Sequence, residues 1–493
     1  MFIYWKMKQY FRKNYLILLI VLLSTFFRFW KLGEFFSFNF DEEYQTLLAW
    51  EQVKNFHPVW IGVSASNVNY YLGPGFTYLT AFLLFIAKDP IILAFFGAAL
   101  GVMTAISIYY VTKKFFSGKA ALYAFTFYSG SLFLNFFDRR FWSATPIAFF
   151  SIWMLFLLYK TVEDQRWVIL AFIFMGLALH IHLSLLAFCP VFAYVIWLAR
   201  KKIKLPTYMG SLAGFFVVTL PLFIFDLNHN FDNMLMPVRF AGKFFEKHNN
   251  INIISSFSQL LNTLSRIWFI SPLSNVQDEI QLGIHGSITK TYILLSMFSL
   301  IILIWFLYKS FIIPGYRILA LAFISFLAVY IFYPGGVVAY YLLGFLTLFT
   351  INIGLFLSNL PARIGILILI IFVLINLSSL ITLKQEQFGL LTRKKLIQKI
   401  MPVVAGNSFY LETRTGDGRK YHSAGGWRYL FKAYGKTPDQ SHADDFFGWI
   451  YQDEISKTKP ELRVIISEYP ARVKEKIITQ FNEGVYYGYV IKN

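Results

Sequence analysis

Eleven apolar runs, separated by more polar segments of varied length, occupy about half of the first 383 residues of the chain. Most are close to the ~20 residues with which a helix crosses a bilayer while satisfying its own backbone hydrogen bonds. The pattern therefore predicts an α-helical polytopic membrane protein. The expected helices lie at about 15–29, 91–112, 120–136, 145–159, 167–179, 183–199, 208–225, 291–308, 318–332, 337–357 and 364–383.

One further apolar run, residues 73–87, is short for a crossing. If it crossed, Lys113, Lys114 and Lys119 would lie outside, whereas Lys and Arg gather on cytoplasmic loops. We therefore expect this run to lie flat in the outer interface, near an amphipathic helix over residues 42–56. The amino terminus and the basic loop at residues 200–204 then lie inside.

The composition changes to that of a water-exposed domain after residue 383. Apolar alternation predicts strands at 408–411, 463–466 and 485–490, with helical stretches at 427–434 and 446–455. We therefore predict two domains, a transmembrane domain over 1–383 and a small α/β domain over 384–493. Eleven crossings of the cell membrane place the second domain on the extracytoplasmic side.

The overall charge adds one exclusion. The chain is 57% hydrophobic and has a net charge of +19. Its basic residues are scattered between apolar runs, which suits anionic lipid rather than nucleic acid. Cys189 is the only cysteine, so an intramolecular disulfide is excluded.

Carboxylates are scarce, with 26 Asp and Glu against 45 Lys and Arg, yet three stand in a row after the first helix. Asp41, Glu42 and Glu43 suit a solvated helix start, with Asp41 as the N-cap and the others in the first turn. They equally suit a catalytic site at which Asp41 is the working carboxylate. The two interpretations are compatible, because a helix cap can also be catalytic.

Further polar groups lie at the outer ends of the predicted helices, and the topology brings them to one face of the membrane. Charge at membrane depth is costly, so a partner or a function is expected for each. Arginine forks match phosphate oxygens, although interface anchoring is the alternative. The groups are Asp138, Arg139, Arg140, His180, His182, Asp226 and His229.

Simpler roles stay open for several of these residues. His180 and His182 are two positions apart, which does not place two metal ligands on one helix face. They suit helix-end histidines or contacts to a phosphate or acceptor. Asp226 with His229 can cap the end of a helix, and an aromatic belt accounts for Tyr341.

Five segments, in this order and spacing, resemble the C-type glycosyltransferase superfamily, which includes protein O-mannosyltransferases and the lipid A aminoarabinose transferase. The first is the acidic pair Asp41-Glu42 behind an initial helix. A departure is Leu72-Gly73-Pro74, where the superfamily often has His-Pro-Pro. The other segments are residues 69–75, 138–146, 176–182 and 220–226.

The resemblance implies a membrane glycosyltransferase that takes a sugar from a polyprenyl-phosphate donor to a protein, lipid or glycan acceptor on the outer face. As hypotheses, the reaction inverts the anomeric centre, and Asp41 and Glu42 are catalytic. A transporter or flippase of lipid-linked sugars and a wall-polymer ligase are the alternatives. We expect Arg139, Arg140 and His182 to bind the donor phosphate, and Tyr70, Tyr71, Asp138, His180, Asp226 and Tyr341 to contact substrates.

No metal site is predicted. A divalent cation at Asp41 and Glu42 stays open, but two adjacent carboxylates are a thin ligand set.

Overall fold

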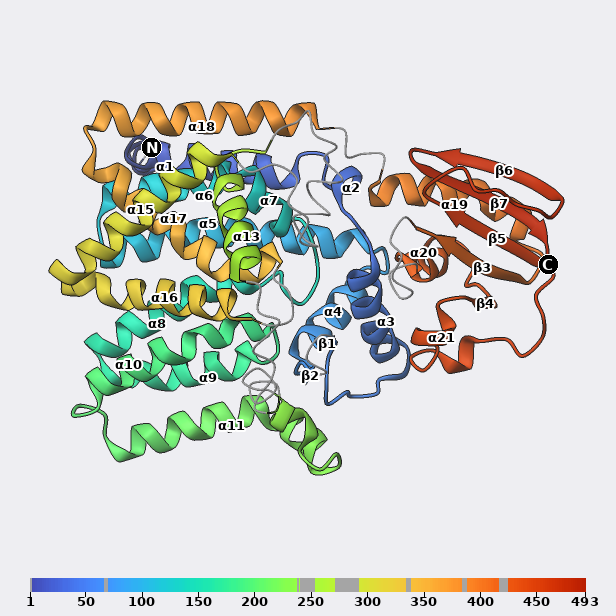
Figure 1. Ribbon diagram of the computed structural model, residues 1–493, viewed down its shortest axis with the longest axis horizontal. Coiled ribbons are helices and arrows are strands. Elements are labelled where there is room, and N and C mark those ends of the chain that lie inside the picture. The colour runs from blue at the N-terminus through green and yellow to red at the C-terminus, as the bar shows by residue number, and fades with distance from the viewer. Residues whose placement is uncertain are drawn as a thin grey trace.

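The computed structural model describes residues 2–65, 70–236, 239, 253–270, 292–333, 338–383, 388–415 and 424–493, with side chains from residue 14 onward. Long helices lie side by side in one part of the molecule, and a sheet with its own helices lies at one end of that bundle (Figure 1). We call this end the site end. The predicted class, a helical membrane protein with a small α/β domain, is confirmed.

Six helices in the described part of the chain are long and apolar enough to cross a membrane. A seventh crossing is possible for α6 (Gly118–Gly130) and α7 (Leu132–Asp138), which are bent by 69° relative to each other. The six are α5 (Ile91–Phe115), α11 (Leu205–Leu227), α15 (Ile293–Ile312), η4 with α16 (Pro314–Ile331), η5 with α17 (Ala339–Asn359) and α18 (Ala362–Thr382).

The remaining predicted runs are also helical but shorter in their apolar part. All eleven runs therefore form helices, whereas a count of eleven crossings is not confirmed. The shorter elements are α1 (Phe2–Phe29, apolar from Asn14), α8 (Ile147–Glu163), α9 (Val168–Ala178), and the 3-10 helix η2 (Leu183–Phe188) that runs into α10 (Cys189–Ala199).

Close backbone contacts and aromatic rings pack the bundle. A Cβ at Gly354 of α17 would lie 2.5 Å from the carbonyl oxygen of Ala120, so a glycine lets α17 and α6 touch. Phe127 of α6 stacks on Phe372 of α18 with ring centroids 4.3 Å apart. Close glycine contacts and stacked rings therefore add to the aliphatic packing of the bundle, as is common between membrane helices.

Short elements cover the site end between α1 and α5. They are α2 (Leu32–Phe35), α3 (Phe40–Asn55), strands β1 (Ser64–Ala65) and β2 (Tyr70–Tyr71), and α4 (Gly75–Ile86). At 12 residues, α4 is about 18 Å long and too short to cross. The N-cap of α3 is Asn39, so the prediction of Asp41 as the N-cap is wrong.

The carboxyl-terminal part is a mixed five-stranded sheet in the order β4-β3-β5-β7-β6, with helices on one side (Figure 1). β3 runs parallel to β4 and β5, and β7 is antiparallel to β5 and β6. The elements are α19 (Leu390–Val404), β3 (Phe409–Arg414), α20 (Trp427–Tyr434), β4 (Gln440–Ser441), α21 (Asp444–Phe447), η8 (Gln452–Glu454), β5 (Leu462–Ser467), β6 (Ile477–Glu483) and β7 (Tyr486–Lys492).

Several elements differ from the sequence predictions. The helix expected at 446–455 is only the short α21 and η8. Helix α19, strand β6 and the helix α13 (Ile253–Arg266) were not predicted. The domain boundary placed at residue 384 falls at residues 384–387, outside the described residues.

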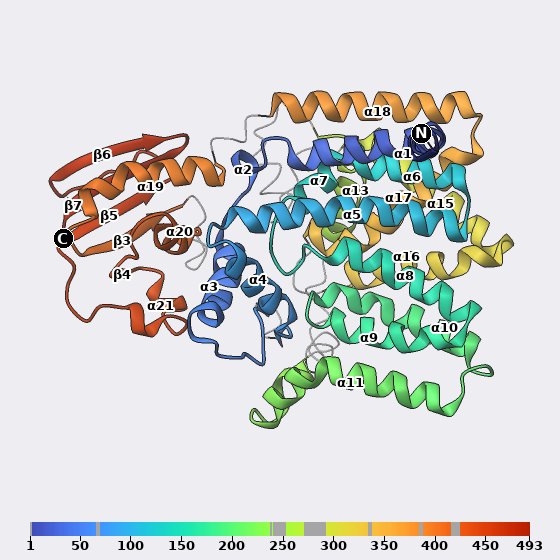
Figure 2. The ribbon, with the colours of Figure 1, turned by 180° about the vertical axis from the view of Figure 1, so that it is seen from behind.

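The carboxyl-terminal domain is packed against α3 rather than hanging free (Figure 2). Phe38 stacks on Tyr429 at 5.8 Å, and Phe40 stacks on Phe447 at 5.2 Å. One buried apolar core continues from α3 and α4 into this domain. The first turn of α3, which carries the acidic cluster, thus lies between the bundle and the sheet.

Candidate active site

The three adjacent carboxylates of α3 point in different directions, because consecutive helical residues are about 100° apart. Glu42 and Glu43 are fully buried, whereas the side chain of Asp41 is 39% exposed. The solvated helix start considered from the sequence therefore holds for Asp41 alone.

Glu42 is bound by Arg140 across the site end. Nε and Nη2 of Arg140 lie 2.8 Å and 2.7 Å from Oε1 of Glu42, and the Asn39 N–H donates to Oε2 at 3.1 Å. Burial raises the pKa of Glu42, and the Arg140 charge opposes that rise. The same guanidinium lies 3.8 Å from the carboxylate of Asp41. Arg140 thus faces both predicted catalytic carboxylates.

A cluster of aromatic rings continues from Arg140. The guanidinium lies over the Trp142 ring at 3.9 Å, and Trp142 contacts Tyr340 at 4.6 Å. Tyr341 contacts Tyr340 at 4.7 Å, and Tyr340 is close enough to Asp41 to interact with its charge. The loop before α8 and the 3-10 helix η5 (Ala339–Leu342), far apart in sequence, therefore meet beside Asp41.

His182 joins this aromatic cluster, with its ring 5.5 Å from Tyr340 and 5.6 Å from Tyr341. Its Nδ1 accepts a hydrogen bond from the Ser184 N–H at 3.1 Å. Burial lowers the pKa of His182 to about 4, so the ring is neutral near pH 7 and carries its proton on Nε2. His182 is therefore a hydrogen-bond donor here, not a cation.

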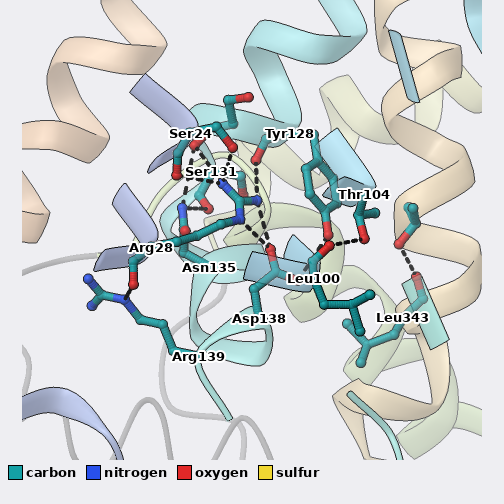
Figure 3. Close-up of polar contacts among 12 residues, drawn as sticks. Ser24, Arg28, Leu100, Thr104, Tyr128, Ser131, Asn135, Asp138, Arg139 and Leu343 are labelled. Carbon is teal, nitrogen blue, oxygen red and sulfur yellow. Dashed lines mark hydrogen bonds and ion pairs between the residues drawn. The ribbon is translucent and has the colours of Figure 1, made fainter. Parts of the chain in front are cut away.

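Arg139 turns away from the acidic cluster. Its Nε donates to the Arg28 carbonyl at 3.1 Å (Figure 3). Its Nη2 donates to the Trp30 carbonyl at 2.5 Å. The guanidinium also lies over the Phe35 ring at 5.3 Å. The structure thus brings Arg140, but not Arg139, to Asp41.

Asp138 forms a buried pair with Arg28, which sequence reasoning missed. Nε of Arg28 donates to Oδ2 of Asp138 at 2.9 Å, and the Tyr128 hydroxyl donates to Oδ1 at 3.0 Å (Figure 3). A Cβ on Gly101 would lie 2.6 Å from Nε of Arg28, so this pair fills the space beside α5. The sequence feature that could have revealed this pair is Arg28 itself, because a lone cation inside an apolar run needs a partner.

The other predicted substrate contacts hold neighbouring loops. Nδ1 of His180 accepts the Gly75 N–H at 3.0 Å, so Nε2 donates to the Val218 carbonyl, also at 3.0 Å. Both ring nitrogens are thus used within the protein, and burial lowers the pKa of His180. His180 joins α4 to α11.

Asp226, at the end of α11, accepts the N–H groups of Asn233 at 3.1 Å and Met234 at 2.8 Å. Asn233 in turn receives the Tyr71 N–H at 2.7 Å. Burial, with the Asp226 charge, raises the pKa of Tyr70 to about 12. These residues form a cap that ties the β2 strand to α11.

A metal site finds no support in the described part of the chain, where no three His, Cys, Asp or Glu side chains gather. Asp41 and Glu42 diverge on the helix, and Glu42 is already bound to Arg140. The pair is thus a poorer cation ligand set than their adjacency suggested.

Comparison with known proteins places this geometry in context. Residues 72–225 match the model of the dolichyl-phosphate-mannose-protein mannosyltransferase family. That segment includes Arg140, His180 and His182. Among curated proteins, none matches the chain significantly.

The fold is shared with solved structures over nearly the whole chain. ArnT from Cupriavidus metallidurans bound to undecaprenyl phosphate is 11% identical with a TM-score of 0.59, covering 97% of this chain and 98% of that one. Its apo state gives 10% identity, a TM-score of 0.58 and coverages of 96% and 97%. The apo oligosaccharyltransferase of Archaeoglobus fulgidus is 13% identical with a TM-score of 0.49, covering 92% of this chain and 69% of that one.

Both comparisons agree with the resemblance found in the sequence, since residues 72–225 match the mannosyltransferase family model and the chain shares the fold of ArnT. At these identities the structural likeness concerns the fold.

Proposed function

We propose that this protein is an integral membrane glycosyltransferase that moves a sugar from a polyprenyl-phosphate donor to an acceptor hydroxyl. The observation that carries the proposal is the position of Arg140, which lies between the exposed carboxylate of Asp41 and the ring of Trp142. A general base, an arginine for phosphate and an aromatic surface for a sugar are thus adjacent. The matched family model and the fold support the same class.

In the proposed reaction, Asp41 takes the proton of the acceptor hydroxyl. The acceptor oxygen forms a bond to the anomeric carbon as the bond from that carbon to the phosphate oxygen breaks. The electron pair leaves with the lipid phosphate. One displacement inverts the anomeric centre, and positioned proton transfer of this kind contributes about 10²–10⁴-fold.

Arg140 and His182 suit the departing phosphate in different ways. Glu42 binds Nε and Nη2 of Arg140 through one oxygen, which leaves Nη1 for a substrate oxygen. The Nε2–H of neutral His182 adds a hydrogen-bond donor. Donors aimed at developing charge in a water-poor site are the largest common source of rate enhancement.

The burial of Glu42 and its pairing with Arg140 support an orienting role for Glu42, although the sequence predicted a catalytic one. The contacts of Arg139 with backbone carbonyls support a structural role for that residue. Within the proposal, Asp41 is the carboxylate with access to substrate.

The orientation in the membrane is part of the proposal. The side chains of Tyr78, Phe82, Phe85 and Ile86 form an exposed apolar stripe on α4, as expected for a helix lying flat against lipid. Lys113, Lys114 and Lys119 lie at the opposite end of the bundle from α4, which supports an extracytoplasmic site end by the positive-inside rule.

Replacing Asp41 with Asn tests the reaction. We expect the variant to fold and bind undecaprenyl phosphate normally but to transfer no sugar, because an amide cannot accept the proton. The assay uses purified protein with a panel of polyprenyl-phosphate monosaccharides, starting with mannose, and follows release of the lipid phosphate. Asp164→Asn, at the opposite end of the bundle, is the matched control. Transfer at the wild-type rate by Asp41→Asn refutes the assignment.

Two rival functions are weaker. A flippase is expected to place polar groups near the bilayer midplane, whereas Asp41, Arg140 and His182 lie at helix ends. A wall-polymer ligase would use arginines of the late loop. Arg239 there is paired with Asp232 at 2.7 Å, and Arg266 is buried over Phe133. A liposome assay that separates lipid flipping from sugar transfer distinguishes the first rival.

A further inference from the structure

The first turn of α3 also binds the carboxyl-terminal domain. Glu43 accepts the N–H groups of Gly426 and Tyr429, each at 3.0 Å. Both groups belong to the start of α20, where free N–H groups and the helix dipole favour a carboxylate. Glu43 is fully buried, so this contact lies inside the interface between the two parts of the molecule.

Arg393 of α19 contacts the same turn from the domain side. Its Nη1 donates to the Phe38 carbonyl at 2.8 Å and to the Gly425 carbonyl, and Nη2 donates to Oδ1 of Asn39 at 2.9 Å. Nε donates to the Tyr486 hydroxyl at 3.1 Å. One buried guanidinium therefore joins the N-cap of α3 to the loop before α20 and to strand β7.

The two backbones also approach closely here. Gly426 has φ +87°, and a Cβ at that position would lie 2.3 Å from the Phe38 carbonyl oxygen. Residues 38–43 are thus held by the domain through Glu43 and Arg393, and by the membrane part through Glu42 and Arg140. Asp41 lies between these two attachments.

We infer that the carboxyl-terminal domain is a working part of the active site, and that Glu43 and Arg393 are positioning residues which hold the first turn of α3 so that Asp41 and Glu42 meet Arg140. This inference rests on the proposed glycosyl transfer. Neither residue touches substrate in it. Their loss lowers turnover more than donor affinity, because Arg140 stays in place.

The test compares two basic residues of one helix. Arg393→Met breaks the contact with α3, whereas Lys394→Met breaks the contact of α19 with Asp89, 3.0 Å away at the start of α5. Arg393→Lys is the conservative variant. Glu43→Gln replaces one of the two acceptor oxygens with an amide NH2 and so loses one of the two hydrogen bonds from the start of α20. Full-length proteins in detergent are examined by hydrogen exchange of residues 40–46, by undecaprenyl phosphate affinity, and by turnover of polyprenyl-phosphate mannose or the panel member that the wild type uses.

We expect Arg393→Met to speed exchange at residues 40–46 about tenfold or more. Turnover falls about tenfold to a hundredfold, as small displacements of catalytic groups do, with undecaprenyl phosphate affinity nearly unchanged. Arg393→Lys retains part of the slow exchange and part of the turnover of the wild type, and Lys394→Met changes neither the exchange nor the turnover. Equal effects of Arg393→Met and Lys394→Met, or unchanged exchange at residues 40–46, overturn the inference.

If Arg393→Met does not fold, Arg393→Lys and Glu43→Gln carry the same comparison. Absence of sugar transfer by the wild type counts against the proposed function instead. The hydrogen-exchange comparison still decides whether the domain holds α3.

Discussion

The guanidinium of Arg140 lies between a buried carboxylate and a half-exposed one. Its chain neighbours have other partners, since Asp138 binds Arg28 and Arg139 binds backbone carbonyls. Three consecutive charged side chains therefore contact three different parts of the molecule. The sequence indicated that this segment matters, but adjacency could not tell which arginine reaches Asp41, because that depends on the turn after α7.

Removal of Arg140 should act on stability and on donor binding separately. Arg140→Ala leaves Glu42 buried without a counter-charge, which costs about 3–5 kcal/mol. The double variant Arg140→Met with Glu42→Gln removes both charges and should recover much of that loss. Thermal unfolding in detergent measures this recovery.

Donor binding should not recover in the double variant, because the phosphate still lacks its arginine. We expect undecaprenyl phosphate affinity to fall about tenfold or more in both variants, for loss of a charge-assisted contact of ~1.5–3 kcal/mol. Normal affinity in the double variant would move the phosphate site away from Arg140.

At the scale of elements, each of the eleven apolar runs predicted within the first 383 residues forms a helix in the part of the chain that the structure describes. A long apolar run is the strongest sequence signal for a helix that faces lipid or the core of a bundle. Helix α13 was missed although its apolar residues gather on one side of the helix, which is the pattern of an amphipathic helix. Strand β6 was missed because none of its residues is buried, so it lacks the alternation of a half-buried strand. The conformation of the loops that form the site could not be predicted from the sequence, because it depends on residues distant in the chain, such as His180.

The loop before α4 gives a prediction at this scale. A Cβ on Gly73 would lie 2.4 Å from Nδ1 of His180, so Gly73→Ala must push the ring off the Gly75 N–H. We expect a loss of about 1–3 kcal/mol, as for overpacking elsewhere. Gly118→Ala, where a Cβ meets nothing within 4 Å, is the control and should be neutral or slightly stabilising. Equal unfolding temperatures for the two variants would contradict the prediction.

At the scale of the whole molecule, the carboxyl-terminal domain closes over the acidic cluster. The sequence indicated an α/β domain but gave no reason for it to touch α3, because Glu43 and Gly426 are far apart in the chain. The contact appears only when both parts are folded. A buried carboxylate at such an interface links domain packing to pH.

Burial raises the pKa of Glu43 from 4.5 to about 7. Because the folded state holds this proton more tightly than the unfolded state, the contribution of Glu43 to stability is present below about pH 4.5 and declines as the pH rises toward 7. The change is on the order of 3 kcal/mol. Glu43→Gln cannot titrate and should lack this decline.

The measurement is the unfolding temperature of both proteins between pH 5 and pH 8. As the pH rises, the unfolding temperature of Glu43→Gln should increase relative to that of the wild type. Two curves that stay parallel across this range would show that Glu43 does not titrate there.

Because the three carboxylates diverge from consecutive positions of α3, the partner of each one depends on the number of residues that precede it in the helix. One residue inserted after Asn39 would send the Asp41 side chain toward Arg140 in place of Glu42, one methylene too short to reach it. Glu42 would then face α20, and no carboxylate would face the substrate. A single inserted residue would thus reassign all three carboxylates together, whereas a substitution changes one.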